Sequence, residues 1–252
     1  MGSGRVTDRV AFVTGGSRGI GRAVVVALAR AGHPVAFCYA SDDAAARETQ
    51  AEVEQLGGKA IAVQADIADA AAVDAAFSEV ESGFGPVTVL VNNAGITRDG
   101  LLVRMSDDAW RAVLDTNLTG AFHTIRRATK GMMKARYGRI VNVSSASAHM
   151  GQAGQANYAA AKAGLVGLSR SVARELAPRG VTCNVVAPGP IVTAMTHDMP
   201  DEWRDQITAV VPAGRFGTPE DCAAVVGFLC SDAAGYVTGA VVPVDGGLAM
   251  GN

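Results

Sequence analysis

Tyr158 and Lys162 lie four residues apart in the stretch GQANYAAAKAG, and this spacing suits proton transfer. The Ala-rich stretch predicts a helix, and residues four apart share one helix face, so the phenol and the ammonium point into the same space. A free phenol has a pKa near 10, and an adjacent cation lowers that pKa by stabilising the phenolate. Such a tyrosine can donate a proton to a carbonyl oxygen as hydride arrives, or accept one in reverse.

Ser145 and Asn117 occupy positions that suit a role beside this pair. Ser145 closes the apolar segment RIVNVSS, and Asn117 lies within the helical segment LDTNLTG. Asn is a mediocre helix former and often marks a local irregularity of the backbone. Each residue alone has an ordinary structural explanation. Together with the glycine-rich turn described next, they predict a catalytic set of Asn117, Ser145, Tyr158 and Lys162.

The glycine-rich turn is the segment TGGSRGIGR, in which Gly15, Gly19 and Gly21 follow an apolar segment and precede a helical one. Glycines there let the backbone approach a pyrophosphate, while the helix N-terminus presents unpaired amides and a positive dipole. The spacing is GxxxGxG rather than the GxGxxG of the familiar fingerprint, so the prediction rests on the strand-turn-helix context. That context predicts a dinucleotide site.

The end of the second apolar segment indicates which dinucleotide is bound. A carboxylate there usually takes the ribose hydroxyls of NAD, whereas a nearby Arg accommodates the extra phosphate of NADP. Here Tyr39 stands at the carboxylate position and Arg18 lies in the glycine turn, which favours NADPH/NADP⁺. Asp42 and Asp43 follow closely and weaken this preference, although their simplest role is to start the next helix.

Seven apolar β-type segments alternate with helical ones, and they must position these residues. The segments are RVAFVT, PVAFCYA, KAIAVQA, VTVLVNN, RIVNVSS, GVTCNVVAP and AVVPVDGG. Continuously apolar strands need cover on both sheet faces, which predicts a parallel doubly wound sheet in an α/β fold. The stretch 41–58 begins with cap-type residues and ends in Gly, so we expect a surface helix there. We expect one Rossmann-like domain over residues 1–252.

The composition excludes several classes of protein. The chain is 49% hydrophobic and 18% charged, which is typical of a soluble globular protein, and its formal charge of -2 gives no reason to expect nucleic acid or membrane binding. The longest apolar run near the start, Ala23 to Ala29, is far shorter than the roughly 20 residues of a membrane span. No secretory signal is recognised, so we expect a cytoplasmic protein.

Cysteine and histidine usage gives no sign of a metal site. The four histidines are scattered, and the four cysteines show no CxxC pairing. We therefore expect buried free thiols at Cys38, Cys183, Cys222 and Cys230.

The chain resembles the short-chain dehydrogenase/reductases of the extended Rossmann type over essentially its whole length. The resemblance rests on TGGSRGIG, Asp66 in ADIAD, NNAG at 92–95, PGPI at 188–191 and the four catalytic candidates. It implies that Tyr158 is the general acid and that Ser145 orients the substrate carbonyl. It also implies that Lys162 binds the nicotinamide ribose and lowers the Tyr158 pKa, and that Asn117 holds a proton-relay water.

The resemblance further implies a set of cofactor-binding residues. Asp66 would contact the adenine, Asn93 and Gly95 would border its ribose, and Ile191 and Thr193 would hold the carboxamide and the phosphates. The full expected set is Gly15, Ser17, Arg18, Gly19, Ile20, Gly21, Tyr39, Ala40, Ser41, Asp66, Ile67, Asn93, Ala94, Gly95, Tyr158, Lys162, Pro188, Gly189, Ile191 and Thr193.

Within this family, several segments most resemble the bacterial 3-oxoacyl-[acyl-carrier-protein] reductases: NNAGITRDGLLVRM, GQANYAAAKAGLVGLSRS and VPAGRFGTPED. The implied reaction is NADPH-dependent reduction of a 3-oxoacyl thioester on acyl carrier protein to the 3-hydroxyacyl thioester. The implied carrier-docking residues are Arg136 and Arg179. The basic run TIRRATKGMMKARYGR suits an acidic carrier, but cations also gather at helix C-termini, so both explanations stay open for the run as a whole.

Three departures from the family pattern leave the acyl substrate open. Pro190 replaces a common aromatic residue, Ala194 stands where many members carry an acid, and Ser144 precedes Ser145 where Gly is frequent. We expect these positions to border the substrate mouth. The alternatives are therefore a polyketide ketoreductase or an acetoacetyl-CoA-type reductase.

The resemblance also implies a homotetramer. The helices that carry Asn117 and Tyr158, and the segment VDGGLAMGN, are the expected contact regions. The stretch AGLVGLSRSVARELA carries more apolar surface than one core face needs, which suits burial between subunits.

Overall fold

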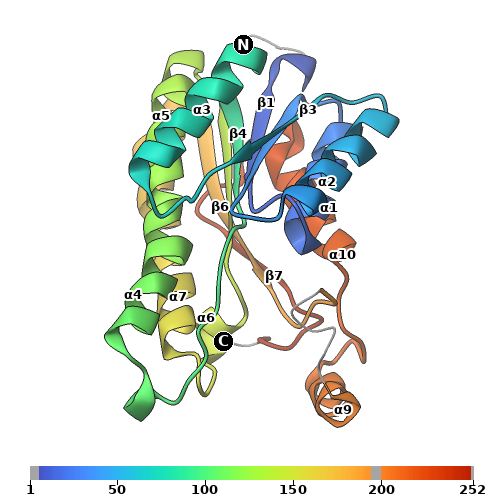
Figure 1. The fold of residues 1–252 in the computed structure, drawn as a ribbon, viewed down its shortest axis with the longest axis vertical. Helices are drawn as coiled ribbons and strands as arrows, with labels where there is room; N and C mark the ends of the chain where they lie inside the picture. The colour runs from blue at the N-terminus through green and yellow to red at the C-terminus, as the bar shows by residue number, and fades with distance from the viewer. Residues whose placement is uncertain (1–5, 194–199, 251–252) are drawn as a thin grey trace.

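A single parallel sheet of seven strands organises the chain (Figure 1). The structure is a computed structural model, and it describes residues 6–193 and 200–250. The strand order is β3-β2-β1-β4-β5-β6-β7, and every neighbouring pair is parallel. The strands are β1 Val10–Thr14, β2 Val35–Tyr39, β3 Ala60–Gln64, β4 Val87–Asn92, β5 Gly138–Val143, β6 Val181–Pro188 and β7 Val241–Val244. The seven predicted strands and the doubly wound α/β fold are confirmed.

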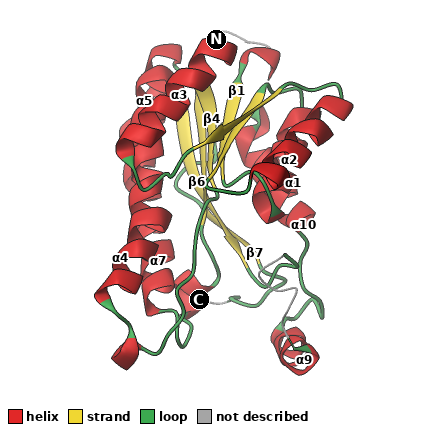
Figure 2. Cartoon of the chain, viewed as in Figure 1, coloured by secondary structure: helices red, strands yellow, loops and turns green. Residues whose placement is uncertain are grey.

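Helices cover both faces of this sheet, as Figure 2 shows. One face carries α1 Gly19–Arg30, α2 Asp43–Gln55 and α10 Pro219–Cys230, and the other carries α3 Ala70–Phe84, α5 Gly120–Ala135 and α7 Ala156–Leu176. The other α-helices among the described residues are α4 Asp107–Leu114, α6 Ser147–Met150 and α9 Asp201–Val210. Short helical turns are η1 Val6–Asp8, η2 Leu102–Arg104, η3 Asp115–Thr119, η4 Ala177–Arg179 and η5 Asp232–Ala234.

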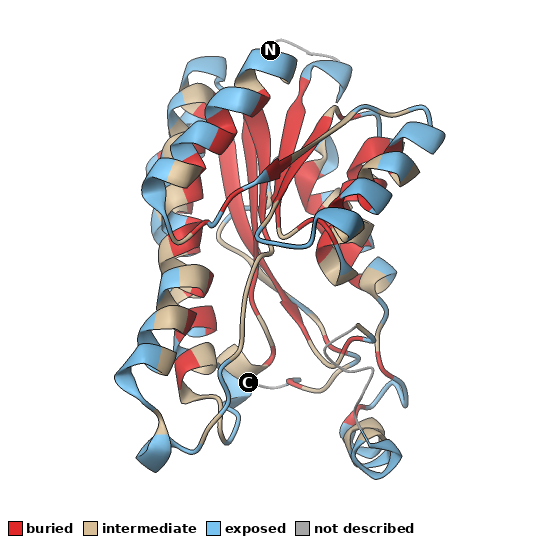
Figure 3. Cartoon of the chain, in the orientation of Figure 1, coloured by how far each residue is buried: buried red, intermediate tan, exposed pale blue. Residues whose placement is uncertain are grey.

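The central strands of the sheet are buried (Figure 3). Apolar side chains on the two faces of the sheet form two separate cores. Phe12 of β1 packs on Phe77 of α3, with ring centroids 4.7 Å apart. On the opposite face, Phe37 of β2 packs with Val24 and Leu28 of α1. Alternate residues of each strand thus point into alternate cores, which explains why the strands are continuously apolar.

The predicted surface helix in 41–58 is confirmed as α2. Its N-cap is Asp42, whose carboxylate accepts the N–H of Ala45 at 3.0 Å, and Asp43 lies in its first turn. Both acids therefore serve the start of the helix, as a capping residue and as a partner of the helix dipole.

All parallel strands end at the same edge of the sheet, and this edge meets the turns that carry the predicted site residues. In a doubly wound sheet, ligands bind in the crevice outside these carboxyl ends. None of the helices that the structure describes is both long and apolar enough to cross a bilayer.

Candidate active site

The turn between β1 and α1 forms a cradle of bare backbone. Gly15 and Gly19 have φ angles of +65° and +55°, a left-handed region that favours glycine. A Cβ added at Gly21 would lie 2.0 Å from the carbonyl oxygen of Gly15, so no side chain fits there. Arg18 is the N-cap of α1 and makes no side-chain capping bond, which leaves the first amides of the helix without a cap.

The same turn is fixed to the end of β4. The side-chain amide of Asn93 donates to the carbonyl oxygens of Thr14 and Gly15, at 3.1 Å in each case. In return, the hydroxyl oxygen of Thr14 accepts the backbone N–H of Asn93 and of Ala94, both at 3.0 Å. Thr14 is fully buried, and it was not among the predicted site residues. Its position directly before the glycines was the available signal.

The segment after β6 closes on this cradle. A Cβ built at Gly19 would lie 3.5 Å from Cγ2 of Thr193, so the two predicted cofactor positions are neighbours although far apart in sequence. Ile191 is buried and forms a β-bridge with Gly217. Pro188 accepts the N–H of Ala146 at 2.8 Å, which ties this segment to the turn that carries Ser145. Ala194, one of the predicted substrate-mouth positions, lies outside the described residues.

Tyr39 stands at the carboxyl end of β2, as predicted, and its phenol hydrogen-bonds the carboxylate of Asp43. Arg18 is exposed beside the glycine turn. The positive charge of Arg47, on α2, acts on Tyr39, and this arginine was not among the predicted residues. The end of β2 therefore carries a phenol, two arginines and two carboxylates that have local partners.

The other predicted cofactor residues surround the same edge. Asp66 is exposed after β3 and accepts the N–H of Ala68 at 2.9 Å, whereas Ile67 is buried. Ser17 is buried, and its carbonyl oxygen accepts the hydroxyl of Thr49 at 3.1 Å. Ala40, Ser41, Gly95 and Gly189 lie in the turns that follow strands, and Ile20 lies in the first turn of α1.

Tyr158 and Lys162 face one another on the first two turns of α7, as the spacing predicted. The ammonium of Lys162 lies 5.6 Å from the centroid of the Tyr158 ring. Its Nζ donates to the carbonyl oxygen of Val143 at 2.7 Å, at the end of β5. Ser145 follows two residues later, and its hydroxyl hydrogen-bonds the Tyr158 phenol. The structure therefore brings the serine, the tyrosine and the lysine together.

The predicted lowering of the Tyr158 pKa by Lys162 is wrong for this structure. Burial raises the pKa of Tyr158 above its usual value of 10, with a smaller raising effect from the charge of Asp99 and a lowering effect from the Ser145 hydrogen bond. The reason is geometric, because the ammonium lies over the ring and is directed at the Val143 carbonyl rather than at the phenol oxygen. Burial also lowers the pKa of Lys162 to about 8.

Asn117 lies in η3, a π-helical turn between α4 and α5, so the predicted backbone irregularity is confirmed. Its side-chain Oδ1 accepts the N–H of Ile96 at 2.8 Å, and its Nδ2 donates to the carbonyl of Ile96 at 2.9 Å. This paired contact fixes the loop after β4. A Cβ at Gly95 would lie 3.2 Å from Asn117 Oδ1 and 3.4 Å from Lys162 Nζ, so this glycine backbone adjoins the catalytic candidates.

Ser144 does not border the substrate mouth, contrary to expectation. It is 3% exposed, and its hydroxyl donates to the backbone carbonyl of Lys162 at 2.8 Å. The side chain points into the protein because adjacent residues at a strand end point to opposite sides. Ser144 thus ties β5 to α7. Pro190, the third departure, presents its carbonyl to the N–H of Gly217 at 2.9 Å.

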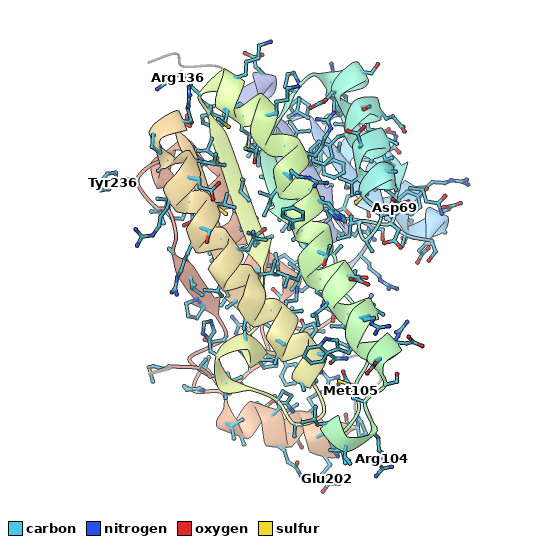
Figure 4. The ribbon with its side chains drawn as sticks, turned by 90° about the vertical axis from the view of Figure 1, so that its left-hand side faces the viewer. Asp69, Arg104, Met105, Arg136, Glu202 and Tyr236 are labelled. Carbon is cyan, nitrogen blue, oxygen red and sulfur yellow. The ribbon has the colours of Figure 1, made fainter. Side chains whose placement is uncertain are left out.

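Arg136 and Arg179 lie together, but far from Tyr158. Arg136 caps α5 in a left-handed conformation with φ of 52°, and its guanidinium donates to the carbonyl of Pro178 at 3.4 Å. Figure 4 shows Arg136 at one end of the helix pair α5 and α7, with Arg104 and Met105 at the other. Tyr158 is near the start of α7 and Arg179 just beyond its end, so about 27 Å of helix separates them.

The four cysteines are buried and unpaired, as expected. Burial raises the pKa of each of their thiols to about 12. Among residues 6–193 and 200–250, no group of three or more His, Cys, Asp or Glu side chains is arranged to hold a metal ion.

Comparison with known proteins places this geometry in a family. Residues 15–249 match the family model described as "Enoyl-(Acyl carrier protein) reductase". The chain is 49% identical over 240 residues to a 3-oxoacyl-[acyl-carrier-protein] reductase of Staphylococcus aureus, covering 95% of this chain and 98% of the relative. It is 46% identical over 242 residues to the enzyme of that name from Escherichia coli, covering 96% and 98% of the two chains.

A solved structure shows the same fold. The crystal structure of a putative gluconate dehydrogenase from Agrobacterium tumefaciens superposes with a TM-score of 0.93 at 35% sequence identity, covering 97% of each chain. With the GxxxGxG cradle, the serine, tyrosine and lysine at one sheet edge, and relatives that match nearly end to end, the chain belongs to the short-chain dehydrogenase/reductase family.

Proposed function

We propose that the protein reduces the 3-oxo group of an acyl thioester on acyl carrier protein to the 3-hydroxyl, with NADPH as reductant. The observation that carries the proposal is the cluster of Ser145, Tyr158 and Lys162 beside the glycine cradle. The choice of substrate is supported by the name shared by relatives that are 46–49% identical over at least 95% of this chain.

The cradle fits a dinucleotide. A pyrophosphate needs close backbone approach and free amides at a helix N-terminus, and the bare turn at Gly15, Gly19 and Gly21 supplies both. Asp66 and Asn93 would hold the adenine end, and Ile191 and Thr193 would hold the carboxamide end. When bound, the nicotinamide supplies hydride chemistry, and the protein supplies orientation and proton transfer.

Each catalytic candidate has a task that its surroundings support. Ser145 orients the substrate carbonyl, and Tyr158 donates the proton to the carbonyl oxygen. Burial keeps the Tyr158 phenol protonated at neutral pH, which is the form that reduction consumes. Lys162 donates to the Val143 carbonyl at the end of β5, and it would bind the nicotinamide ribose when the cofactor is present. The Asn117 side chain fixes Ile96 through two hydrogen bonds, and this residue would hold a proton-relay water.

The preference for NADPH is supported by the end of β2. Asp42 caps α2 and Asp43 interacts with the Tyr39 phenol, so each carboxylate already has a local partner at the start of α2. Arg18 and Arg47 supply positive charge for a 2′-phosphate.

Arg136 and Arg179 form a compact basic patch that suits an acidic carrier. Its distance from Tyr158 in the same chain agrees with the proposed homotetramer. If two copies pack α5 and α7 antiparallel about a twofold axis, the patch of one protomer lies beside the Tyr158 end of its partner. The exposed Phe122 on α5 is apolar surface of the kind such packing buries.

The main test is the Tyr158→Phe variant. Loss of the proton donor should lower kcat for NADPH-dependent reduction of acetoacetyl carrier protein by on the order of 10² or more. Tyr236→Phe is the matched control, since Tyr236 is fully exposed and its variant should keep normal turnover. Near-normal turnover by Tyr158→Phe would contradict the proposal.

The docking patch is tested by the Arg136→Ala/Arg179→Ala double variant. The KM for acetoacetyl carrier protein should rise, because docking is weakened, while the KM for acetoacetyl-CoA should stay unchanged. Arg30→Ala, an exposed arginine at the end of α1, is the control. Equal KM values for the carrier-bound substrate in the double variant and the wild type would remove the patch from the proposal.

A further inference from the structure

Asn157, the residue before Tyr158, is fully buried and uses its side chain in three directions. Its Nδ2 donates to the carbonyl oxygen of Arg98 at 3.0 Å and to that of Ala109 at 3.3 Å. Its Oδ1 accepts the backbone N–H of Tyr158 at 2.8 Å. One amide group therefore joins the loop after β4, helix α4 and the first turn of α7.

The bond to Tyr158 takes the place of a missing helix cap. The first amides of a helix have no partner within the helix, and a side chain at the N-cap usually accepts one of them. Gln155 is the N-cap of α7, and it makes no such bond. The Asn157 side chain accepts the Tyr158 N–H instead, so it fixes the backbone that carries the phenol.

The loop after β4, which Asn157 contacts at Arg98, is also held by other hydrogen bonds. Asn117 pairs with Ile96 as described above, and Gln155 Nε2 donates to Asp99 at 3.0 Å. The N–H of Gly100 donates to the carbonyl of Gly154 at 2.8 Å. Among these side chains, the buried Asn157 also hydrogen-bonds the backbone of Tyr158. The loop and the start of α7 thus form one connected piece beside the reaction centre.

We propose that Asn157 is a positioning residue for the catalytic tyrosine. It fixes the position of the Tyr158 backbone relative to the loop after β4, and therefore the distance from the phenol to the substrate carbonyl. The inference rests on the proposed function. No isosteric substitute preserves the three contacts, because they need two N–H donors and one acceptor in the same plane. Leu would leave two carbonyls and one N–H without this partner in a buried place.

The pH dependence of kcat in an Asn157→Asp variant distinguishes a positioning role from a merely structural one. The aspartate keeps the acceptor for Tyr158 but turns an oxygen toward the Arg98 and Ala109 carbonyls. Burial and these carbonyls favour the protonated acid, whose single O–H restores one of the two hydrogen bonds that the amide donated. The kcat of Asn157→Asp, as a fraction of the wild-type kcat at the same pH, should therefore rise as the pH falls from 8 to 6.

Asn157→Ala gives the size of the effect. Because a misplacement of about 1 Å can cost up to ~10²-fold in rate, its kcat should fall on the order of 10–100-fold at every pH. The KM for NADPH should stay within about threefold, since the glycine cradle is untouched. Ser169→Ala, on the same helix, is the matched control. Ser169 Oγ accepts a buried hydrogen bond of 2.7 Å from Asn142 Nδ2 of β5, and the kcat of the variant should stay near the wild-type value.

Hydrogen exchange separates this inference from the proposed function. Measured by mass spectrometry, the amides of residues 94–101 should exchange faster in Asn157→Ala than in the wild type or Ser169→Ala, whatever substrate the enzyme takes. If the wild type reduces no acetoacetyl thioester, the proposed function fails. The exchange result still tests whether Asn157 holds the loop after β4 against the start of α7. Unchanged exchange, a kcat for Asn157→Ala within threefold of wild type, or a pH-independent Asn157→Asp ratio would each overturn the inference.

Discussion

Gly21→Ala tests whether the cradle needs bare backbone. An alanine Cβ at this position would lie 2.0 Å from the Gly15 carbonyl oxygen and 2.5 Å from Asn93 Nδ2. Real Cβ contacts essentially never fall below 3.0 Å, so the Gly15 turn must open by about 1 Å (3.0 minus 2.0). Overpacking of this kind costs ~3 kcal/mol, which corresponds to a fall in Tm of roughly 6–12 °C for a chain of this length.

The same displacement should weaken NADPH binding. Moving the turn amides loses at least one hydrogen bond to a charged group, worth ~1.5–3 kcal/mol, and this raises the NADPH Kd by roughly 10–100-fold. Thermal unfolding without cofactor and calorimetric titration with NADPH measure the two effects separately.

Gly131→Ala in α5 is the matched control. Its added Cβ meets Pro86 Cβ at 3.8 Å, an ordinary contact, and alanine is the better helix former by ~0.5–1 kcal/mol. This control should raise the Tm slightly and leave the NADPH Kd unchanged. A Gly21→Ala protein with wild-type Tm and Kd would refute the geometric argument, because the turn would then have room that the structure denies it.

Two further predictions follow from buried titratable groups. Burial lowers the pKa of His33 from 6.5, and its Nδ1 lies 2.8 Å from the Arg9 carbonyl oxygen. As the pH falls below 6.5, His33 becomes protonated in the unfolded chain but stays neutral in the folded one. The free energy of unfolding therefore falls. Urea titrations from pH 7 to 5 should show a shallower fall for His33→Gln, and equal slopes would exclude His33 as the cause. The four cysteines, with thiol pKa values of about 12, should react with a thiol reagent such as DTNB only after denaturation; rapid labelling of the native protein would show that a thiol is exposed.

For the Tyr158 pKa, the direction of shift expected from local sequence differs from the direction that the tertiary structure gives. The i, i+4 spacing placed the phenol and the ammonium on one helix face, and the structure bears this out at 5.6 Å. Spacing on a helix does not say where an ammonium at the end of a flexible chain points. That is decided by the Val143 carbonyl, which comes from β5 and lies far away in sequence. The expected direction of the pKa shift therefore failed while the expected proximity held.

The sequence by itself determined the seven strands, the glycine turn, the irregular helix at Asn117 and the grouping of Ser145, Tyr158 and Lys162. These follow from patterns in nearby residues: apolar runs, helix caps, glycine positions and the four-residue helical period. The tertiary structure alone decided contacts between distant segments: the closure of Thr193 on Gly19, the burial of Ser144, and the clamp of Asn157 on Arg98. It also placed Arg136 beside the segment after the C-terminal end of α7 that carries Arg179, whereas Tyr158 lies near the start of this helix. The physical reason is that hydrogen-bond direction and burial depend on which segments the sheet brings together. Local residue patterns do not determine which distant segments become neighbours.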